Sequence, residues 1–275
     1  MARLPQRIAC LSTESVEVLY ALGEEARIAG ISGFTTRPAR ARKEKPKISG
    51  FSTARSDKIL AVRPDLVLAF SDLQGDICHE LVKAGIEVHH FNQRSVAGIL
   101  AMIETIGRLV GAEDRALALA GELEAQIDSV RHAAARLPRR PRVYFEEWDE
   151  PMISGIQWVS ELVGIAGGDD VFPELAQRGT ARERIIAEKS ALAIRRPDIV
   201  IASWCGKKFR PERFRERFAG FDFPALATGE VHEIKSAHIL SPGPAAIQEG
   251  LPQLARIIGR WAAISAVMST ATSGT

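Results

Sequence analysis

The sequence predicts an α/β protein made of two doubly wound, mostly parallel α/β lobes joined by one long rigid helix. Short apolar runs alternate with amphipathic helical phrases along the whole chain, which is typical of a mostly parallel sheet. One strand phrase occurs twice, as RPDLVLAF at 63–70 and as RPDIVIASW at 196–204. A long helical stretch without proline lies between the two copies. Together these observations indicate two similar halves with a helical connection.

The predicted strands are the short runs rich in β-branched and leucyl residues. In the first half they lie at 7–12, 27–32, 65–70 and 87–92, and in the second half at 142–147, 198–203 and 230–235.

The repeated phrase indicates a helix that stops and a buried strand that follows. Pro64 and Pro197 disfavour helix at the residue before them and cannot donate to a sheet, so we expect each at the first position of a strand. The copies end on aromatic residues, Phe70 and Trp204. Ligands bind at the carboxyl ends of strands in open α/β sheets, so each lobe is expected to present one aromatic side chain to a ligand.

The connection is a predicted helix over 112–136, with apolar residues at helical spacing and a length of roughly 37 Å at 1.5 Å per residue. It is longer than a crossover within one sheet requires, so we interpret it as a strut between lobes at 1–111 and 141–264. The cluster Pro138-Arg139-Arg140-Pro141 is expected to end it. The polar tail, 265–275, is expected to fray.

The composition argues against several functional classes. A net charge of +2, without a basic block, gives no indication of nucleic-acid binding. Cys10, Cys78 and Cys205 are widely spaced, which predicts reduced thiols and neither a disulfide framework nor a structural zinc site. We expect no metal site and no intrinsic cofactor.

No run approaches the ~20 apolar residues of a membrane span, and the first residues lack the apolar core of a secretory signal. As written, the chain is expected to be cytoplasmic, or periplasmic if a leader was removed.

Six segments together resemble one family: RIACLSTESVEVLYALG, KISGF, DKILAVRPDLVLAF, ISGIQWVSELVGIAGGDDVF, RRPDIVIASW and HILSPGPAAIQEGLPQL. In order and spacing they are similar to the substrate-binding proteins of ABC importers for cobalamin, ferric siderophores and haem, and most similar to the group labelled cobalamin-binding. The resemblance covers nearly the whole chain. It implies a monomer that binds a metal chelate in a cleft between its lobes and delivers it to an ABC permease.

The resemblance also directs attention to side chains near strand ends. Aromatic residues expected to line one cleft between the lobes are Phe34, Phe51, Phe70, Trp148 and Trp204. In cobalamin receptors of this class the first three positions commonly hold tyrosine or tryptophan, so phenylalanine keeps the apolar wall but removes every donor on the rings. Polar groups expected to contact the ligand are Asp72, Gln74, Arg94, Glu147, Cys205, Lys207 and His238.

In this class an acidic residue on each lobe pairs with permease arginines, and the matching positions here are Asp76 and Glu212. Glu212 lies within KKFRPERFRER, whose basic residues would repel a permease's arginines.

An enzymatic function is the alternative to a binding protein. There is no nucleophile elbow and no glycine-rich phosphate loop, and the histidines are scattered. Cys205 beside lysines could be a nucleophile or a ligand to cobalt or iron. A cytoplasmic enzyme or sensor that retains the receptor fold therefore stays open as the alternative, with the non-enzymatic receptor favoured.

Overall fold

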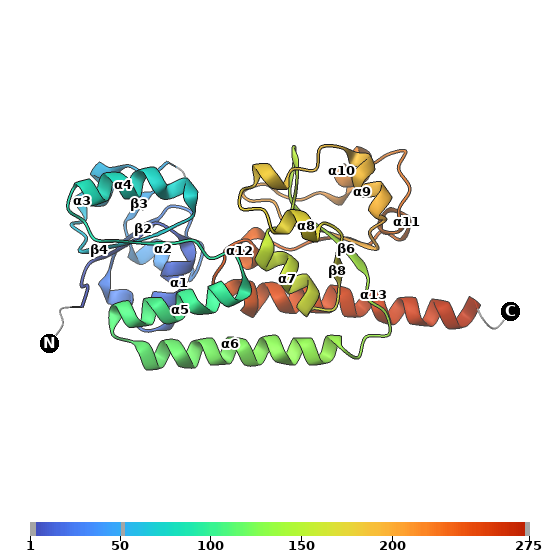
Figure 1. The fold of residues 1–275 in the computed structure, drawn as a ribbon, viewed down its shortest axis with the longest axis horizontal. Helices are drawn as coiled ribbons and strands as arrows, with labels where there is room; N and C mark the ends of the chain where they lie inside the picture. The colour runs from blue at the N-terminus through green and yellow to red at the C-terminus, as the bar shows by residue number, and fades with distance from the viewer. Residues whose placement is uncertain (1–3, 51–52, 273–275) are drawn as a thin grey trace. The chain divides into compact units, whose positions relative to one another are not determined.

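The computed structural model describes residues 4–50 and 53–272, and the chain divides into two compact units. Unit 1 comprises the residues up to Gln93, Ala97–Leu123 and Ser241–Pro244. Unit 2 comprises Arg94–Val96, Glu124–Leu240 and the residues from Ala245 on. Figure 1 traces the elements in chain order.

Unit 1 holds a parallel sheet of five strands in the order β3-β2-β1-β4-β5. The strands are β1 (Ile8–Cys10), β2 (Ile28–Ser32), β3 (Lys47–Ser49), β4 (Leu66–Phe70) and β5 (Val88–Phe91). The helices are α1 (Thr13–Ala21), α2 (Ala41–Glu44), α3 (Ser56–Ala61), α4 (Gly75–Lys83) and α5 (Val96–Val110), with short 3-10 turns at Glu25–Arg27 and Asp72–Gln74.

The core of unit 1 follows from the alternation of side chains along each strand. Ala9, Leu11, Val67 and Ala69 point to one face of the sheet, where α3 and α4 supply Ile59, Ile77, Cys78 and Leu81. On the opposite face the thiol of Cys10 meets Ser15 of α1. Both faces of β1 and β4 are therefore covered, as their uninterrupted apolar sequences require.

Unit 2 holds a mostly parallel sheet of five strands, in the order β10-β9-β6-β7 with β8 also paired to β6. Only β7 runs antiparallel. The strands are β6 (Arg142–Asp149), β7 (Met152–Ser154), β8 (Asp169–Asp170), β9 (Ile199–Ala202) and β10 (Val231–Glu233). The helices are α7 (Gln157–Ile165), α8 (Pro173–Ala176), α9 (Lys189–Arg195), α10 (Pro211–Arg217), α11 (Pro224–Thr228), α12 (Ser236–Ile239) and α13 (Leu251–Thr272), with a 3-10 turn at Arg182–Arg184 and a π-helical stretch at Ala246–Gly250.

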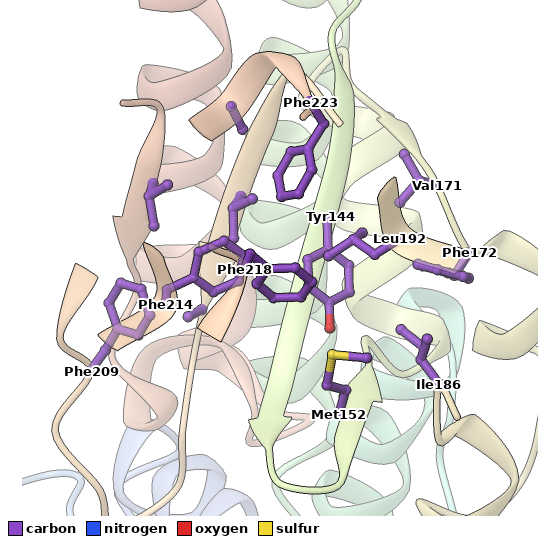
Figure 2. Packing of buried hydrophobic residues seen from close by; sticks show 14 of the residues in the cluster. Tyr144, Met152, Val171, Phe172, Ile186, Leu192, Phe209, Phe214, Phe218 and Phe223 are labelled. Carbon is purple, nitrogen blue, oxygen red and sulfur yellow. The ribbon is translucent and has the colours of Figure 1, made fainter. Parts of the chain in front are cut away.

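Aromatic rings dominate one core cluster of unit 2 (Figure 2). Phe218 lies 4.8 Å from Phe214 and 5.7 Å from Phe223 between ring centroids, and Tyr144 of β6 lies 5.8 Å from Phe172. Phe214 lies in α10, Phe218 directly follows that helix, and Phe223 directly precedes α11. All three are buried in the cluster, so they help to hold these short helices on the sheet.

The predicted helix over 112–136 is present as α6 (Glu113–Ala134), and the boundary between the units falls inside it, after Leu123. All the predicted strands are present, whereas the short strands β3, β7 and β8 were not anticipated. The tail differs from expectation, because α13 continues to Thr272 instead of fraying from 265. Its alanine-rich sequence favours helix, and Trp261 and Ala262 are buried.

The repeated Arg-Pro-Asp phrase has the same role in each unit. Arg63 and Arg196 adopt left-handed conformations, with φ of 45° and 47°, that end the helices before them. Asp65 then accepts the backbone N–H of Arg7 at 2.9 Å, and Asp198 accepts that of Arg142 at 2.8 Å. Each aspartate thus fastens the start of one strand to the next, β4 to β1 and β9 to β6. The prolines lie two residues before the strands, outside the predicted first position.

Among the described residues, every helix is too short or too polar to cross a bilayer.

Candidate functional site

In unit 1 the strand order reverses direction between β1 and β4, so the loops that follow these two strands flank a topological switch point. In the loop after β4, Ser71 has a left-handed backbone conformation, with φ of 72°, which is uncommon for a residue other than glycine. Ser71 Oγ accepts the Leu73 N–H at 3.4 Å and donates to Asp72 at 2.9 Å, and the Ser71 carbonyl lies 2.8 Å from Nε2 of His90. The loop leaves the Asp72 side chain exposed at the carboxyl edge of the sheet.

Two side chains expected at the ligand point inward. Gln74 is 1% exposed; its Oε1 accepts the Phe70 N–H and its Nε2 donates to the Leu11 carbonyl, each at 3.0 Å. Phe70 is also buried, as the last residue of β4. Gln74 therefore clamps β4 to the loop after β1, an interior role that its sequence position did not indicate.

Two large apolar side chains at the same edge remain in solvent. Phe34 follows β2 and Leu73 follows β4, and each is 62% exposed. The carbonyl of Phe34 accepts from Oγ1 of Thr13 at 3.4 Å, which fixes the backbone beside the ring. Phe34 was expected from the sequence, whereas Leu73 was not.

A buried carboxyl that was not anticipated lies in the first turn of α1. Glu14 is 4% exposed, Oε1 has no hydrogen-bond partner, and burial raises its pKa to about 7. The late segment Ser241–Pro244 covers it: a Cβ atom built on Gly243 would lie 2.5 Å from Glu14 Cβ. The carbonyl of Pro242 accepts from Nε2 of Gln93 at 2.9 Å, which holds the segment in place.

In unit 2, charged and aromatic groups meet at the carboxyl end of β6. Lys207 Nζ lies 2.5 Å from Asp149 Oδ2, 4.9 Å from the ring centroid of Trp204 and 5.4 Å from that of Trp148. The fold thereby brings together three predicted residues. Trp148 lies in β6, whereas Trp204 and Lys207 lie in the loop after β9, far away in the sequence.

Trp204 nevertheless belongs mainly to the interior. It is 5% exposed in the aromatic core cluster, 4.9 Å from the Phe209 ring, and its Nε1 donates to Glu146 at 3.2 Å. The sequence instead predicted a ring presented to the ligand. Trp148 is only partly buried and packs against the outside of the same cluster.

Glu146 is the centre of a buried polar network. Its carboxylate accepts from Tyr144 at 3.1 Å and from Nη2 of Arg217 at 2.5 Å, in addition to Trp204. Burial raises the pKa of Glu146, and the charge of Arg217 opposes that shift. Glu147, on the other face of β6, makes a bidentate ion pair with Arg184. Neither arginine could be assigned from sequence, because each lies in a segment rich in basic residues.

The remaining predicted residues lie at separate places. Nη1 of Arg94 donates to the Gly179 carbonyl at 2.6 Å, and His238 lies 3.2 Å from Glu249 and 3.0 Å from Gln253. Cys205 is an exposed free thiol. Phe51 lies outside the described residues.

Asp76 and Glu212, expected at a permease, are both exposed in the first turns of their helices, α4 and α10. Across residues 4–50 and 53–272 no group of three or more histidine, cysteine or acidic side chains is arranged to hold a metal ion. That the aromatic residues of the two units line one cleft stays a prediction.

Comparison with known proteins gives consistent matches. The family described as periplasmic binding protein matches residues 8–237. The cobalamin-binding protein of Halobacterium salinarum is 23% identical over 256 residues, covering 89% of this chain and 67% of the relative. The vitamin B12-binding protein of Vibrio campbellii is 25% identical over 203 residues, covering 72% of this chain and 70% of the relative.

Solved structures share the fold. The periplasmic heme-binding protein RhuT from Roseiflexus sp. RS-1 superposes with a TM-score of 0.80 at 20% identity, covering 94% of this chain and 99% of that one. The periplasmic vitamin B12-binding protein BtuF of Vibrio cholerae gives 0.74 at 17% identity, covering 94% and 98%.

Proposed function

Because the chain belongs to the periplasmic binding protein family, we propose that it is the substrate-binding protein of an ABC-type importer and that it binds a metal chelate. A corrinoid such as cobalamin is the favoured ligand, and haem and ferric siderophores belong to the same chemical class. The curated relatives named above are cobalamin- and vitamin B12-binding proteins, which supports this choice.

The observation that carries the proposal is the exposure of Phe34. A phenylalanine that is 62% exposed, at the carboxyl edge of an α/β sheet and on the same edge as the equally exposed Leu73, leaves apolar area in water. Ligands of open α/β sheets bind at this edge, so exposed apolar side chains there support a binding surface. The faces of a corrin or porphyrin ring are large and apolar, so they would cover these side chains and remove that area from water.

The charge arrangement of unit 2 favours a ligand fringed with amides over one fringed with carboxylates. The cations nearest the carboxyl end of β6 each have an acidic partner within the unit: Arg184 with Glu147, Arg217 with Glu146, and Lys207 with Asp149. A ligand carboxylate would have to compete with these partners. Amide groups need only hydrogen bonds, and we assign their exchange to Asp72 and His238.

Docking to a permease is assigned to Asp76 and Glu212, one exposed acidic side chain on each unit. Glu212 is flanked by exposed Arg213 and Arg215, so we expect it to contribute less than Asp76. We expect the protein to act as a monomer. The alternative of a cytoplasmic enzyme or sensor gains no support from the relatives, which are named as binding proteins.

The test is retention of a coloured ligand. Purified protein is incubated separately with cyanocobalamin, cobinamide, haemin and a ferric hydroxamate siderophore, then desalted, and its absorption spectrum is recorded. We expect a stoichiometric corrinoid spectrum, with weaker or no retention of haemin. Stoichiometric haemin without corrinoid would overturn the choice of ligand, and retention of none would overturn the chelate proposal.

A matched pair of variants locates the surface. Phe34→Ala should weaken corrinoid binding about tenfold, which corresponds to ~1.4 kcal/mol from lost stacking and buried area. Val82→Ala removes an apolar side chain of similar exposure, 58%, from α4 in the same unit and should leave the affinity unchanged. If both substitutions changed the corrinoid affinity equally, Phe34 would not belong to the binding site.

A further inference from the structure

An ammonium group lies close to two indole rings and a carboxylate at the carboxyl end of β6. Lys207 Nζ lies 2.5 Å from Asp149 Oδ2, and 5.4 Å and 4.9 Å from the ring centroids of Trp148 and Trp204. Trp148 and Asp149 are the last two residues of β6, whereas Trp204 and Lys207 follow β9. The pairing of these parallel strands sets their ends side by side, and the site is formed entirely within unit 2.

These are the groups by which proteins recognise ammonium cations. Aromatic faces attract a cation through the ring quadrupole, and tryptophan is the strongest of the aromatic side chains in this respect. The carboxylate adds a full negative charge. The carboxylate of Asp149 can accept a further hydrogen bond beside its contact with the lysine, because its Oδ1 atom is buried and has no hydrogen-bond partner.

The rings and the carboxylate are held independently of the lysine. Nε1 of Trp148 donates to the Glu150 carbonyl at 2.9 Å, Nε1 of Trp204 donates to Glu146, and the Asp149 carbonyl accepts from Nη1 of Arg217 at 2.7 Å. The lysine is less constrained. Its side chain is 37% exposed, and the position of a Cβ atom on the preceding residue, Gly206, has nothing within 4 Å.

We propose that Trp148, Trp204 and Asp149 form a binding site for an alkylammonium group and that Lys207 fills this site as a built-in competitor. An external cation binds only when the lysine withdraws. A tethered competitor acts at a high effective concentration, so the intact protein binds alkylammonium ions weakly. Trp148, Trp204 and Lys207 are also residues expected at the chelate ligand, but the groups of this site all lie within unit 2, so it can be tested without any chelate.

The probe is tetramethylammonium chloride, which carries the charge and the apolar surface but no donors. It is titrated into the full chain by calorimetry and by tryptophan fluorescence, with sodium chloride at the same ionic strength as the blank. Lys207→Ala should bind it about tenfold more tightly than the wild type, since one or two cation–π contacts and an ion pair no longer have to be displaced.

Three control variants distinguish the effect of emptying the site from the effect of removing a positive charge. Lys207→Met removes the charge but keeps an apolar stem in the site, so it should gain much less than Lys207→Ala. Lys208→Ala removes a neighbouring exposed lysine and should behave as the wild type. Asp149→Asn combined with Lys207→Ala should lose the gain.

Equal affinities of Lys207→Ala and the wild type would overturn the proposal, and so would an equal gain in Lys208→Ala. Thermal melting of each variant shows that it is folded. If Lys207→Ala does not fold, Lys207→Ser replaces it with the same expected gain, because it also leaves the rings uncovered.

Discussion

The guanidinium of Arg184 holds both carboxylate oxygens of Glu147, with Nη1 at 2.6 Å from Oε2 and Nη2 at 3.0 Å from Oε1. Arg184 is 2% exposed and also donates to the Ser154 carbonyl. It comes from a 3-10 turn, and Glu147 comes from β6. The bidentate geometry therefore fastens the loop after α8 to the centre of the sheet.

Removing the charge of Glu147 should destabilise unit 2 strongly. In Glu147→Gln the Arg184 charge stays buried without a counter-ion, which typically costs about 3–5 kcal/mol. Urea denaturation measures the loss. The exposed ion pair between Arg55 and Asp57 serves as control, and Asp57→Asn should leave the denaturation midpoint unchanged. A midpoint for Glu147→Gln equal to that of the wild type would show that the pair contributes nothing.

Glu14 should make the protein less stable as the pH rises. Burial raises its pKa from 4.5 to about 7, so between these values the folded state binds a proton that the unfolded state releases. Stability is then lost progressively from about pH 4.5 to about pH 7, by roughly 3 kcal/mol for this group. Denaturation midpoints at pH 5 and pH 8 measure the difference.

The matched variant for this effect is Glu14→Gln, which keeps the shape and cannot ionise. Its pH dependence between these values should be flatter than that of the wild type. Glu17, which lies one turn further along α1 and pairs with Arg37, is unchanged in both proteins. An unchanged slope in Glu14→Gln would assign the pH dependence to another group.

The two tryptophans near Lys207 should respond differently to truncation. Trp204 is buried in the aromatic core, so Trp204→Ala should cost about 3–5 kcal/mol of stability. The sequence had instead predicted that Trp204 faces the ligand. Trp148 is half-buried at the edge of the cluster, so Trp148→Ala should lower the melting temperature much less. Equal drops in melting temperature would contradict this division between core and edge.

The approach of Gly243 to α1 should not tolerate a side chain. A Cβ atom there would lie 2.5 Å from Glu14 Cβ and 3.2 Å from Glu14 Cα, so the covering segment must shift. Gly243→Ala should destabilise by about 1–3 kcal/mol. Gly121 of α6 is exposed with nothing within 4 Å, so Gly121→Ala should instead stabilise by about 0.5–1 kcal/mol. Thermal denaturation of both variants shows whether each substitution stabilises or destabilises the protein.

Much of the fold could be predicted from the sequence because its signals are local. Strand-like runs bounded by turn residues predicted β1, β4, β6 and β9 among others, and an unbroken helical period predicted α6. The family resemblance is confirmed by the match over residues 8–237, although the last of the six segments lies beyond that range. The repeated Arg-Pro-Asp phrase predicted two similar halves, although its aspartates proved to fasten neighbouring strands, which a linear pattern does not reveal.

What only the tertiary structure decided is which side chain faces which. Phe34 and Phe70 both stand near strand ends in the sequence, yet one is exposed and the other buried, because strand pairing and the covering helices determine which positions stay in solvent. Arg184 and Glu147 are 37 residues apart, and Lys207 and Asp149 are 58 apart. Ion pairs of this kind depend on loops that bring distant strand ends together. The residues next to a charged side chain in the sequence therefore do not identify its partner.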